Sequence, residues 1–184
     1  MAISTDTSAS GASPYPEANE PSEAAAVNAV ELKGVRKSFG ETEVVRGIDL
    51  EVRSGEFFAL LGPSGCGKTT TLKLIGGFEQ PTQGNIRIGN KSVEGVPAFQ
   101  RDVNTVFQSY ALFPHLDVRD NVAFGLRMSG VSRRERRSRA EAALDRLHLP
   151  SSTRRQVDDL SGREQQRSAL ARATINRTSV LLLA

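Results

Sequence analysis

The sequence predicts an α/β fold, and three observations support this prediction. Residues 62–69 read Gly-Pro-Ser-Gly-Cys-Gly-Lys-Thr, which fits the phosphate-binding loop pattern G-x-x-x-x-G-K-[S/T]. The apolar run 56–61 before this loop is typical of a buried strand, and residues 69–75 after it are typical of a helix that stops at Gly76-Gly77. The run 179–184 resembles a fully buried parallel strand. A strand, a glycine-rich loop and a helix in this order direct backbone N–H groups at phosphates.

The N-terminal part is expected to form a tail followed by a small antiparallel sheet. Residues 1–28 are rich in Ser, Ala, Pro and Glu without a hydrophobic period, which predicts a disordered tail. A nucleotide-binding domain is then expected over residues 29–184. Within it, residues 30–35 and 43–52 alternate as strands with one solvated face, and residues 83–89 form a short strand between turn residues.

From Val118 the hydrophobic period becomes helical, which predicts an α-helical subdomain over about 115–176. Two capping boxes, Ser132–Glu135 and Ser161–Glu164, are expected to begin two of its helices, and the first of these ends before Pro150. An earlier, partly buried helix is indicated by the apolar residues Val118, Val122, Phe124, Leu126 and Met128.

Composition limits the class of protein only loosely. The chain has 184 residues, enough for one domain, and a formal charge of +3. The tail is acidic and the remainder mildly basic, which suits phosphate ligands or an acidic membrane surface but is too weak to indicate nucleic acid. The single Cys66 excludes an intramolecular disulfide. No apolar run approaches the ~20 residues of a membrane helix and no secretory signal is present, so a cytoplasmic location is expected.

Further segments align around the phosphate loop, and over roughly residues 30–184 the chain resembles the ATP-binding subunits of ABC transporters. The string 106–116, which contains Gln108, resembles the Q-loop of importers. Phe39 matches the aromatic residue on which the family stacks adenine. Residues 77–81 and 104–128 most resemble the spermidine/putrescine importers. The expected fold is therefore a P-loop core with the antiparallel β-subdomain and the helical subdomain.

The resemblance implies ATP and Mg²⁺ as ligands. Lys68 would hold the β- and γ-phosphates as a point charge. Thr69 and Gln108 would serve Mg²⁺, and Gln108 would also sense the γ-phosphate. The expected nucleotide-binding residues are Phe39, Gly62, Pro63, Ser64, Gly65, Cys66, Gly67, Lys68, Thr69 and Thr70.

Residues 160–167 resemble the signature motif L-S-G-G-Q, which in this family contacts the γ-phosphate bound on the opposite protomer through a helix N-terminus. Arg163 stands where the second glycine belongs and adds bulk where backbone approaches phosphate. Glu164 replaces glutamine and brings a negative charge near an anion. Arg163 is the residue available to offset that charge. The residues expected to act in trans are Ser161, Gly162, Arg163 and Glu164.

The C-terminal end departs most from the family. After three apolar residues the family has an Asp that orients magnesium and a Glu that polarises water, but here Ala184 stands at the Asp position and the chain ends. The domain is thus expected to be C-terminally incomplete, with no catalytic residue present. A missing general base typically costs ~10²–10⁴ in rate. An apolar edge and face would also be left open, which predicts poor solubility without a partner.

Three functions follow from these observations. The first is the energy-coupling subunit of a polyamine importer. In that function two copies, head to tail, sandwich ATP and drive a transmembrane permease at the inner face of the membrane, without touching the substrate. The second is a hydrolysis-deficient ATP-binding remnant or regulatory module, which Ala184, Arg163 and Glu164 favour. The third is an ABC protein acting on nucleic acid or ribosomes, but such proteins usually carry paired cassettes and this chain has one.

Other charged residues receive structural interpretations. The arginines of residues 133–139 are interrupted by Glu135 and lack interleaved aromatics, so we expect a solvated helix face and no nucleic-acid partner. His115 lies in the stretch that the family places at the transmembrane subunit, which disfavours a role as general base. His148 falls at a predicted helix end, where a cation suits the helix dipole.

Overall fold

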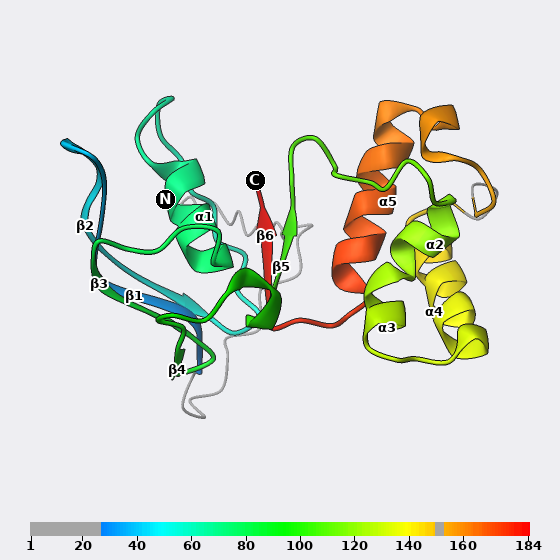
Figure 1. Cartoon of the computed structure of the whole chain (residues 1–184), viewed down its shortest axis with the longest axis horizontal. Helices are drawn as coiled ribbons and strands as arrows, with labels where there is room; N and C mark the ends of the chain where they lie inside the picture. Colours follow the sequence, from blue (N-terminus) through cyan, green and yellow to red (C-terminus); the bar gives the residue numbers. More distant parts are fainter. Residues whose placement is uncertain (1–26, 150–152) are drawn as a thin grey trace, which may run out of the picture.

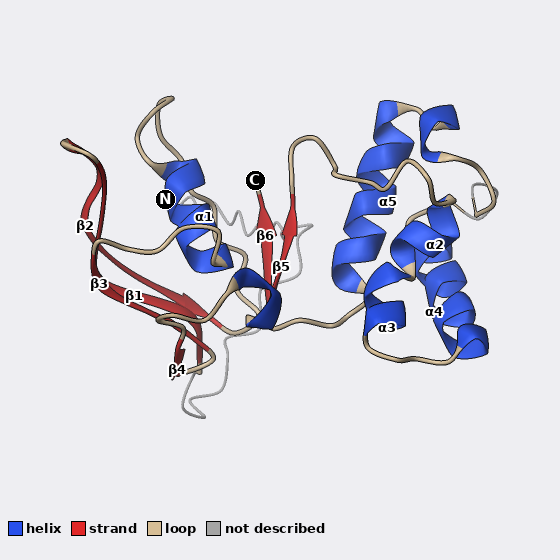
Figure 2. Cartoon of the chain, in the orientation of Figure 1, coloured by secondary structure: helices blue, strands red, loops and turns tan. Residues whose placement is uncertain are grey.

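A computed structural model describes residues 27–149 and 153–184, and within them the chain forms two lobes (Figure 1). The first lobe combines strands with a single α-helix, whereas the second contains only helices and loops (Figure 2). The chain passes between the lobes twice, through residues 107–117 and again through residues 175–179. The predicted tail lies outside the described residues except for Val27 and Asn28, and Asn28 already belongs to a strand.

The larger sheet of the first lobe is antiparallel, as expected from the alternating segments. Its strand order is β2-β1-β3-β4, with β1 hydrogen-bonded to both β2 and β3. Apolar side chains from alternate positions of β1 and β3 point to one face and form the core of this lobe. The three predicted strands are confirmed, and β4 was not predicted. The strands are β1 (Asn28–Phe39), β2 (Thr42–Arg53), β3 (Gln83–Ile88) and β4 (Lys91–Ser92).

Helix α1 (Lys68–Gly76) lies between this sheet and the second sheet (Figure 1). It ends as predicted, because Gly77 takes a left-handed conformation with φ +80°. The buried Arg101, which follows the 3-10 turn η1 (Ala98–Gln100), donates from Nη1 to the carbonyls of Leu74 at 2.8 Å and Ile75 at 2.9 Å. A Cβ on Gly77 would lie 2.6 Å from Arg101 Nε, so only glycine admits this guanidinium.

The second sheet consists of two parallel strands, β5 (Val103–Val106) and β6 (Val180–Leu183). The parallel pairing of the C-terminal run is therefore confirmed, but its full burial was a wrong prediction. Val180 and Leu182 are buried in the core, whereas Leu181 and Leu183 face the other side and are exposed. Alternate residues of β6 point to opposite sides of the strand, and only the side with Val180 and Leu182 packs into the core.

The strand predicted over residues 56–61 is not formed. These residues have no regular secondary structure, and Phe57 and Leu61 are 86% and 90% exposed. An apolar, strand-like composition forms a strand only where a neighbouring strand supplies hydrogen-bond partners, and residues 56–61 pair with no strand within the described part of the chain. The prediction of a buried strand before the glycine-rich loop was therefore wrong.

The second lobe packs its helices around an apolar core that includes Val118, Leu126, Leu144 and Ala171. The single helix predicted from Val118 is in fact two short helices, because the ψ angle of Ala123, −5°, departs from the helical value and turns the chain. The elements of this lobe are α2 (Val118–Val122), α3 (Phe124–Met128), α4 (Arg133–Arg146), the 3-10 turn η3 (Val157–Asp159) and α5 (Gly162–Thr174).

The two predicted capping boxes have different outcomes. At α4 the Ser132 hydroxyl accepts from the Glu135 N–H, as predicted, but the Glu135 carboxylate pairs with Arg139 Nη1 at 3.6 Å instead of completing the box. At α5 both bonds of the box are present. His148 lies two residues beyond the end of α4 in a left-handed conformation with φ +57°, and its N–H donates to the carbonyl of Asp145 at 2.9 Å, which agrees with a structural role. In the part of the chain that the structure describes, no helix has the length and apolar character needed to cross a bilayer.

Candidate functional site

The glycine-rich loop of residues 62–67 leads directly into α1 and is exposed except for Gly67. Gly67 is the N-cap of α1, with φ +93°, and a Cβ at this position would lie 3.0 Å from the carbonyl oxygen of Val44. This close contact with β2 and the left-handed backbone both require glycine. The sheet thus supports the loop from one side and leaves its other side open.

The N-terminus of α1 has the properties of an anion site. No side chain caps it, and its first turn contains no acidic residue. The N–H groups of a first helical turn have no partner within the helix and carry the positive end of the helix dipole. Lys68 lies in this turn, and its Nζ donates to the carbonyls of Gly62 and Pro63, each at 2.7 Å. An ammonium group held over the loop, beside free N–H groups, fits the phosphates of a nucleotide.

Phe39 ends β1 on the hairpin that backs the loop, and its side chain is about half exposed. The Nζ atom of Lys37 lies 4.7 Å from the centre of the Phe39 ring and also pairs with Glu79 at 3.0 Å. A cation over one face of the ring leaves the other face for a second planar group. Sequence reasoning missed Lys37, because alternation along a strand does not show which neighbours approach a ring.

Gln108 is exposed in the turn that follows β5. The next residues are held in an unusual conformation, with φ +61° at Tyr110 and +47° at Ala111. Arg172 of α5 donates to the carbonyls of both residues, at 3.0 Å and 2.7 Å. Burial lowers the pKa of the Arg172 guanidinium from its ordinary value, although arginine stays protonated at neutral pH. Arg172 thus attaches the turn that carries Gln108 to α5. No local sequence pattern predicted this role for Arg172.

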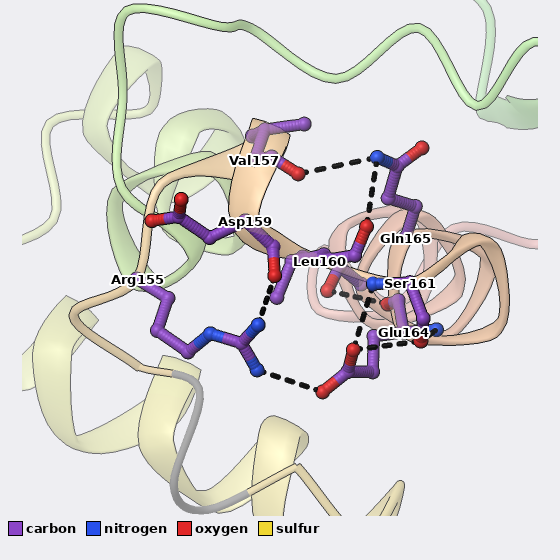
Figure 3. Close-up of polar contacts among 8 residues, drawn as sticks. Arg155, Val157, Asp159, Leu160, Ser161, Glu164 and Gln165 are labelled. Carbon is purple, nitrogen blue, oxygen red and sulfur yellow. Dashed lines mark hydrogen bonds and ion pairs between the residues drawn. The ribbon is translucent and has the colours of Figure 1, made fainter.

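The signature segment begins α5, and Figure 3 shows its polar contacts. The Ser161 hydroxyl accepts from the Glu164 N–H, and Glu164 Oε2 accepts from the Ser161 N–H at 2.8 Å and hydroxyl at 2.7 Å. Gly162 is exposed, and a Cβ there would meet no atom within 4 Å. Backbone at this helix start is therefore accessible to a partner.

The counterion of Glu164 is Arg155, and not Arg163 as the sequence suggested. Arg155 Nη1 lies 2.9 Å from Glu164 Oε1. Hydrogen bonds from the Ser161 hydroxyl and N–H, followed by the charge of Arg155, lower the pKa of the Glu164 carboxyl from its ordinary value. Arg155 lies nine residues before Glu164 and outside the motif, so sequence reasoning had no signal for it.

Ala184 lies beside the turn of Gln108, because its N–H donates to the carbonyl of Val106 at 3.0 Å. The resemblance expects an Asp at this place, and alanine offers no ligand oxygen there. Across residues 27–149 and 153–184, no group of three His, Cys, Asp or Glu side chains could hold a metal ion by itself. Oxygen ligands for Mg²⁺ would come from Thr69, Gln108 and the nucleotide phosphates.

The expected site residues are divided between the lobes. Phe39, residues 62–70 and Gln108 belong to the first lobe or its edge, whereas residues 161–164 begin a helix of the second lobe (Figure 1). The two halves of the expected site therefore lie on different parts of one chain.

This chain belongs to the ABC transporter family, whose sequence model matches residues 45–183. It is similar to the spermidine/putrescine import ATP-binding protein of Rubrobacter xylanophilus, with 56% identity over 155 residues that cover 84% of this chain and 41% of that protein. The protein of the same name from Thermobifida fusca is 50% identical over 185 aligned residues, which cover 98% of this chain and 48% of that protein. The chain thus spans less than half of the length of these relatives.

Solved structures agree with this family and with the fold class. The dimeric structure of MJ0796, a bacterial ABC transporter cassette, matches with a TM-score of 0.76 and 32% identity over 84% of this chain and 72% of that chain. A dimeric post-hydrolysis state of the same cassette, bound to ADP and Pi, matches equally well at 33% identity. Membership of the family implies a nucleotide ligand, typically with Mg²⁺, and the bare N-terminus of α1 fits such a ligand.

Proposed function

We propose that this chain is the ATP-binding, energy-coupling part of an ABC importer that takes up polyamines. The observation that carries the proposal is the uncapped, acid-free N-terminus of α1 with Lys68 held over the glycine-rich loop. This arrangement favours the binding of anionic ligands, and it favours a ligand with several adjacent phosphates most.

The residues of the first lobe would bind Mg²⁺-ATP as follows. Lys68 exchanges its two carbonyl partners for the β- and γ-phosphates, while the N–H groups of the first turn of α1 take the remaining phosphate oxygens. Thr69 and Gln108 would hold the metal ion, which would neutralise phosphate charge when bound. Phe39 offers its free ring face to the adenine.

Energy coupling would use two chains. The bare α1 of one copy and the signature helix α5 of the other, arranged head to tail, would enclose one nucleotide between them. Exposed Gly162 at the start of α5 supports this arrangement, because backbone can approach a phosphate there. The pair would act on a transmembrane permease at the inner face of the cell membrane, and the transported molecule would not touch this chain.

The substrate class is supported by similarity alone. The relatives that are 50–56% identical carry the name spermidine/putrescine import ATP-binding protein. We expect the whole protein to restore uptake of labelled putrescine in bacteria that lack their own subunit of this kind. Equal restoration of sulfate or sugar uptake, without putrescine uptake, would contradict the polyamine assignment and leave the ATP-binding proposal intact.

Nucleotide binding is tested by Lys68→Ala, with Lys73→Ala as the matched control. Both lysines lie on α1, but Lys73 is exposed in its last turn and away from the loop. Loss of a charged hydrogen-bond donor to phosphate costs about 1.5–3 kcal/mol, or roughly 10- to 150-fold in affinity. We expect Lys68→Ala to weaken Mg²⁺-ATP binding by this factor in a fluorescence titration. Equal affinities of the two variants would refute a site at this loop.

A second candidate function is ATP binding without turnover. It is favoured by Ala184, which follows β6 beside the Gln108 turn at the position where the resemblance expects an Asp. An ATPase assay that compares the protein with Lys68→Ala separates the two functions. Phosphate release equal in both would support a binding module, and release lost in the variant would support the enzyme.

A further inference from the structure

The signature segment carries an acid where the family has glutamine, and the structure pairs that acid with a residue outside the motif. We infer that Arg155 is a positioning residue that holds and neutralises Glu164, so that an acidic signature segment can face a nucleotide phosphate. The inference rests on the proposed head-to-tail function and adds to it a residue and an electrostatic requirement.

Both carboxylate oxygens of Glu164 are engaged within the chain (Figure 3). Oε2 accepts two hydrogen bonds from Ser161, and Oε1 accepts one from Arg155. The side chain is therefore folded back over the first turn of α5. Its charge is balanced at 2.9 Å by a guanidinium group.

Arg155 itself is fixed by contacts that do not involve Glu164. Its carbonyl accepts from the N–H of Val118 at 3.1 Å, which ties its backbone to the start of α2. Its Nη2 donates to the carbonyl of Asp159 (Figure 3). These contacts place the guanidinium beside Glu164 before any ligand arrives, which reduces the entropy cost of the pairing.

The electrostatic reason for the pair follows from the position of Glu164 in the first turn. The N-terminus of α5 attracts anions through free N–H groups and the helix dipole. An unbalanced carboxylate in that turn would repel a phosphate at close range, with an interaction that stays significant at a protein surface. Arg155 cancels this repulsion and leaves the dipole effective. The side chains of the pair are 41% and 28% exposed, so a phosphate on a second copy can approach them.

The test compares Arg155→Gln, Glu164→Gln and the double variant in the whole protein. Self-association is measured by analytical ultracentrifugation with Mg²⁺ and a non-hydrolysable ATP analogue, and analogue affinity is measured separately in dilute protein. We expect Arg155→Gln to weaken association roughly three- to tenfold, because Glu164 is left unbalanced. The double variant should recover association to within about twofold of Glu164→Gln, because no charge remains to balance.

The outcomes separate the inference from the function on which it rests. If Arg155→Gln and the double variant are equally weak, Arg155 only supports the local fold and the inference is overturned. If the unmodified protein binds the analogue but does not associate, the proposed head-to-tail association is refuted. The inference about Arg155, which depends on that association, is then refuted as well. Arg155→Lys, which keeps the charge, should retain most of the association even if Arg155→Gln loses thermal stability.

Discussion

Two helices of this chain begin at segments that we propose contact phosphate, yet their N-termini are built in opposite ways. Helix α1 begins at a left-handed glycine, without a side-chain cap and without an acid in its first turn. Helix α5 begins at Ser161 with a complete capping box, an acid in its first turn and a guanidinium beside that acid. The first N-terminus has no side-chain cap, whereas at the second the N–H groups of Ser161 and Glu164 are bound by side chains and the backbone at Gly162 stays accessible.

The difference shows which kind of site a sequence reveals. The site at α1 depends on backbone conformation within a few consecutive residues. Its glycines and lysine therefore form a pattern that can be recognised in the sequence. The site at α5 depends on charge balance between segments that are distant in the sequence, and its counterion was assigned to the wrong arginine. Four predictions follow, from the largest expected effect to the smallest.

The largest effect is expected for Arg101→Met, which releases the far end of α1. The Arg101 guanidinium is buried and donates to four carbonyls, those of Leu74, Ile75, Val93 and Val96. Leaving a buried acceptor without its donor costs about 1–3 kcal/mol, so the loss of one donor group shared by four carbonyls is expected to cost about 3–5 kcal/mol in total. We expect urea unfolding to show a loss of this size. Arg87→Met, on the exposed face of β3, should change the unfolding free energy by less than about 0.5 kcal/mol.

If Arg101→Met is as mild as its control, α1 is not held from its C-terminal end. The position of α1 would then depend on the contact between Gly67 and the Val44 carbonyl of β2 at its N-terminal end.

The second prediction applies one substitution to both helix starts and expects opposite signs. Gly67→Ala forces a side chain into a left-handed backbone and against the carbonyl of Val44, which should cost about 1–3 kcal/mol of unfolding free energy. Gly162→Ala meets open space at the first position of α5 and should raise stability by about 0.5–1 kcal/mol. Thermal unfolding of the two variants measures both. A stabilising Gly67→Ala would show that the left-handed N-cap is not required.

Local patterns predicted much of the fold correctly, while pairing between distant segments was not predictable from them. The end of α1 at Gly77 and the capping box at Ser161 depend on residues within one turn of each other, and both are confirmed. The strand expected over residues 56–61 was wrong, because composition does not show whether a neighbouring strand is present. Arg101 and Arg172 were missed for the same reason, since their carbonyl partners lie on other elements.

The third prediction concerns the cap of α5. Ser161→Ala removes the side-chain cap and should cost about 1 kcal/mol of unfolding free energy. Ser132→Ala is the matched control at α4, where the box is incomplete, and should cost less. Urea unfolding of both variants tests whether the reciprocal bond of the box matters. Equal losses would mean that the Glu164 carboxylate adds nothing to the cap of α5.

The smallest effect is a pH dependence at α5 that α1 lacks, since α1 has no acid in its first turn. Hydrogen bonds from Ser161 and the charge of Arg155 lower the pKa of the folded-state Glu164 carboxyl from its ordinary value. A carboxyl with a lowered folded-state pKa stabilises the fold above its unfolded pKa, and this contribution is lost as the pH falls through the folded pKa. The stability advantage of the protein over Glu164→Gln should therefore be constant near neutral pH and shrink as the pH falls below about 4.3.

The same titration in a Ser161→Ala background isolates the cause. Ser161 supplies the largest part of the pKa shift through its hydroxyl, so its removal should leave a weaker pH dependence that reflects Arg155 and the Ser161 N–H. An unchanged pH dependence in that background would show that the hydroxyl contributes nothing and would assign the shift to Arg155 and the backbone N–H of residue 161. The serine side chain would then not be the cause of the pH dependence that distinguishes α5 from α1.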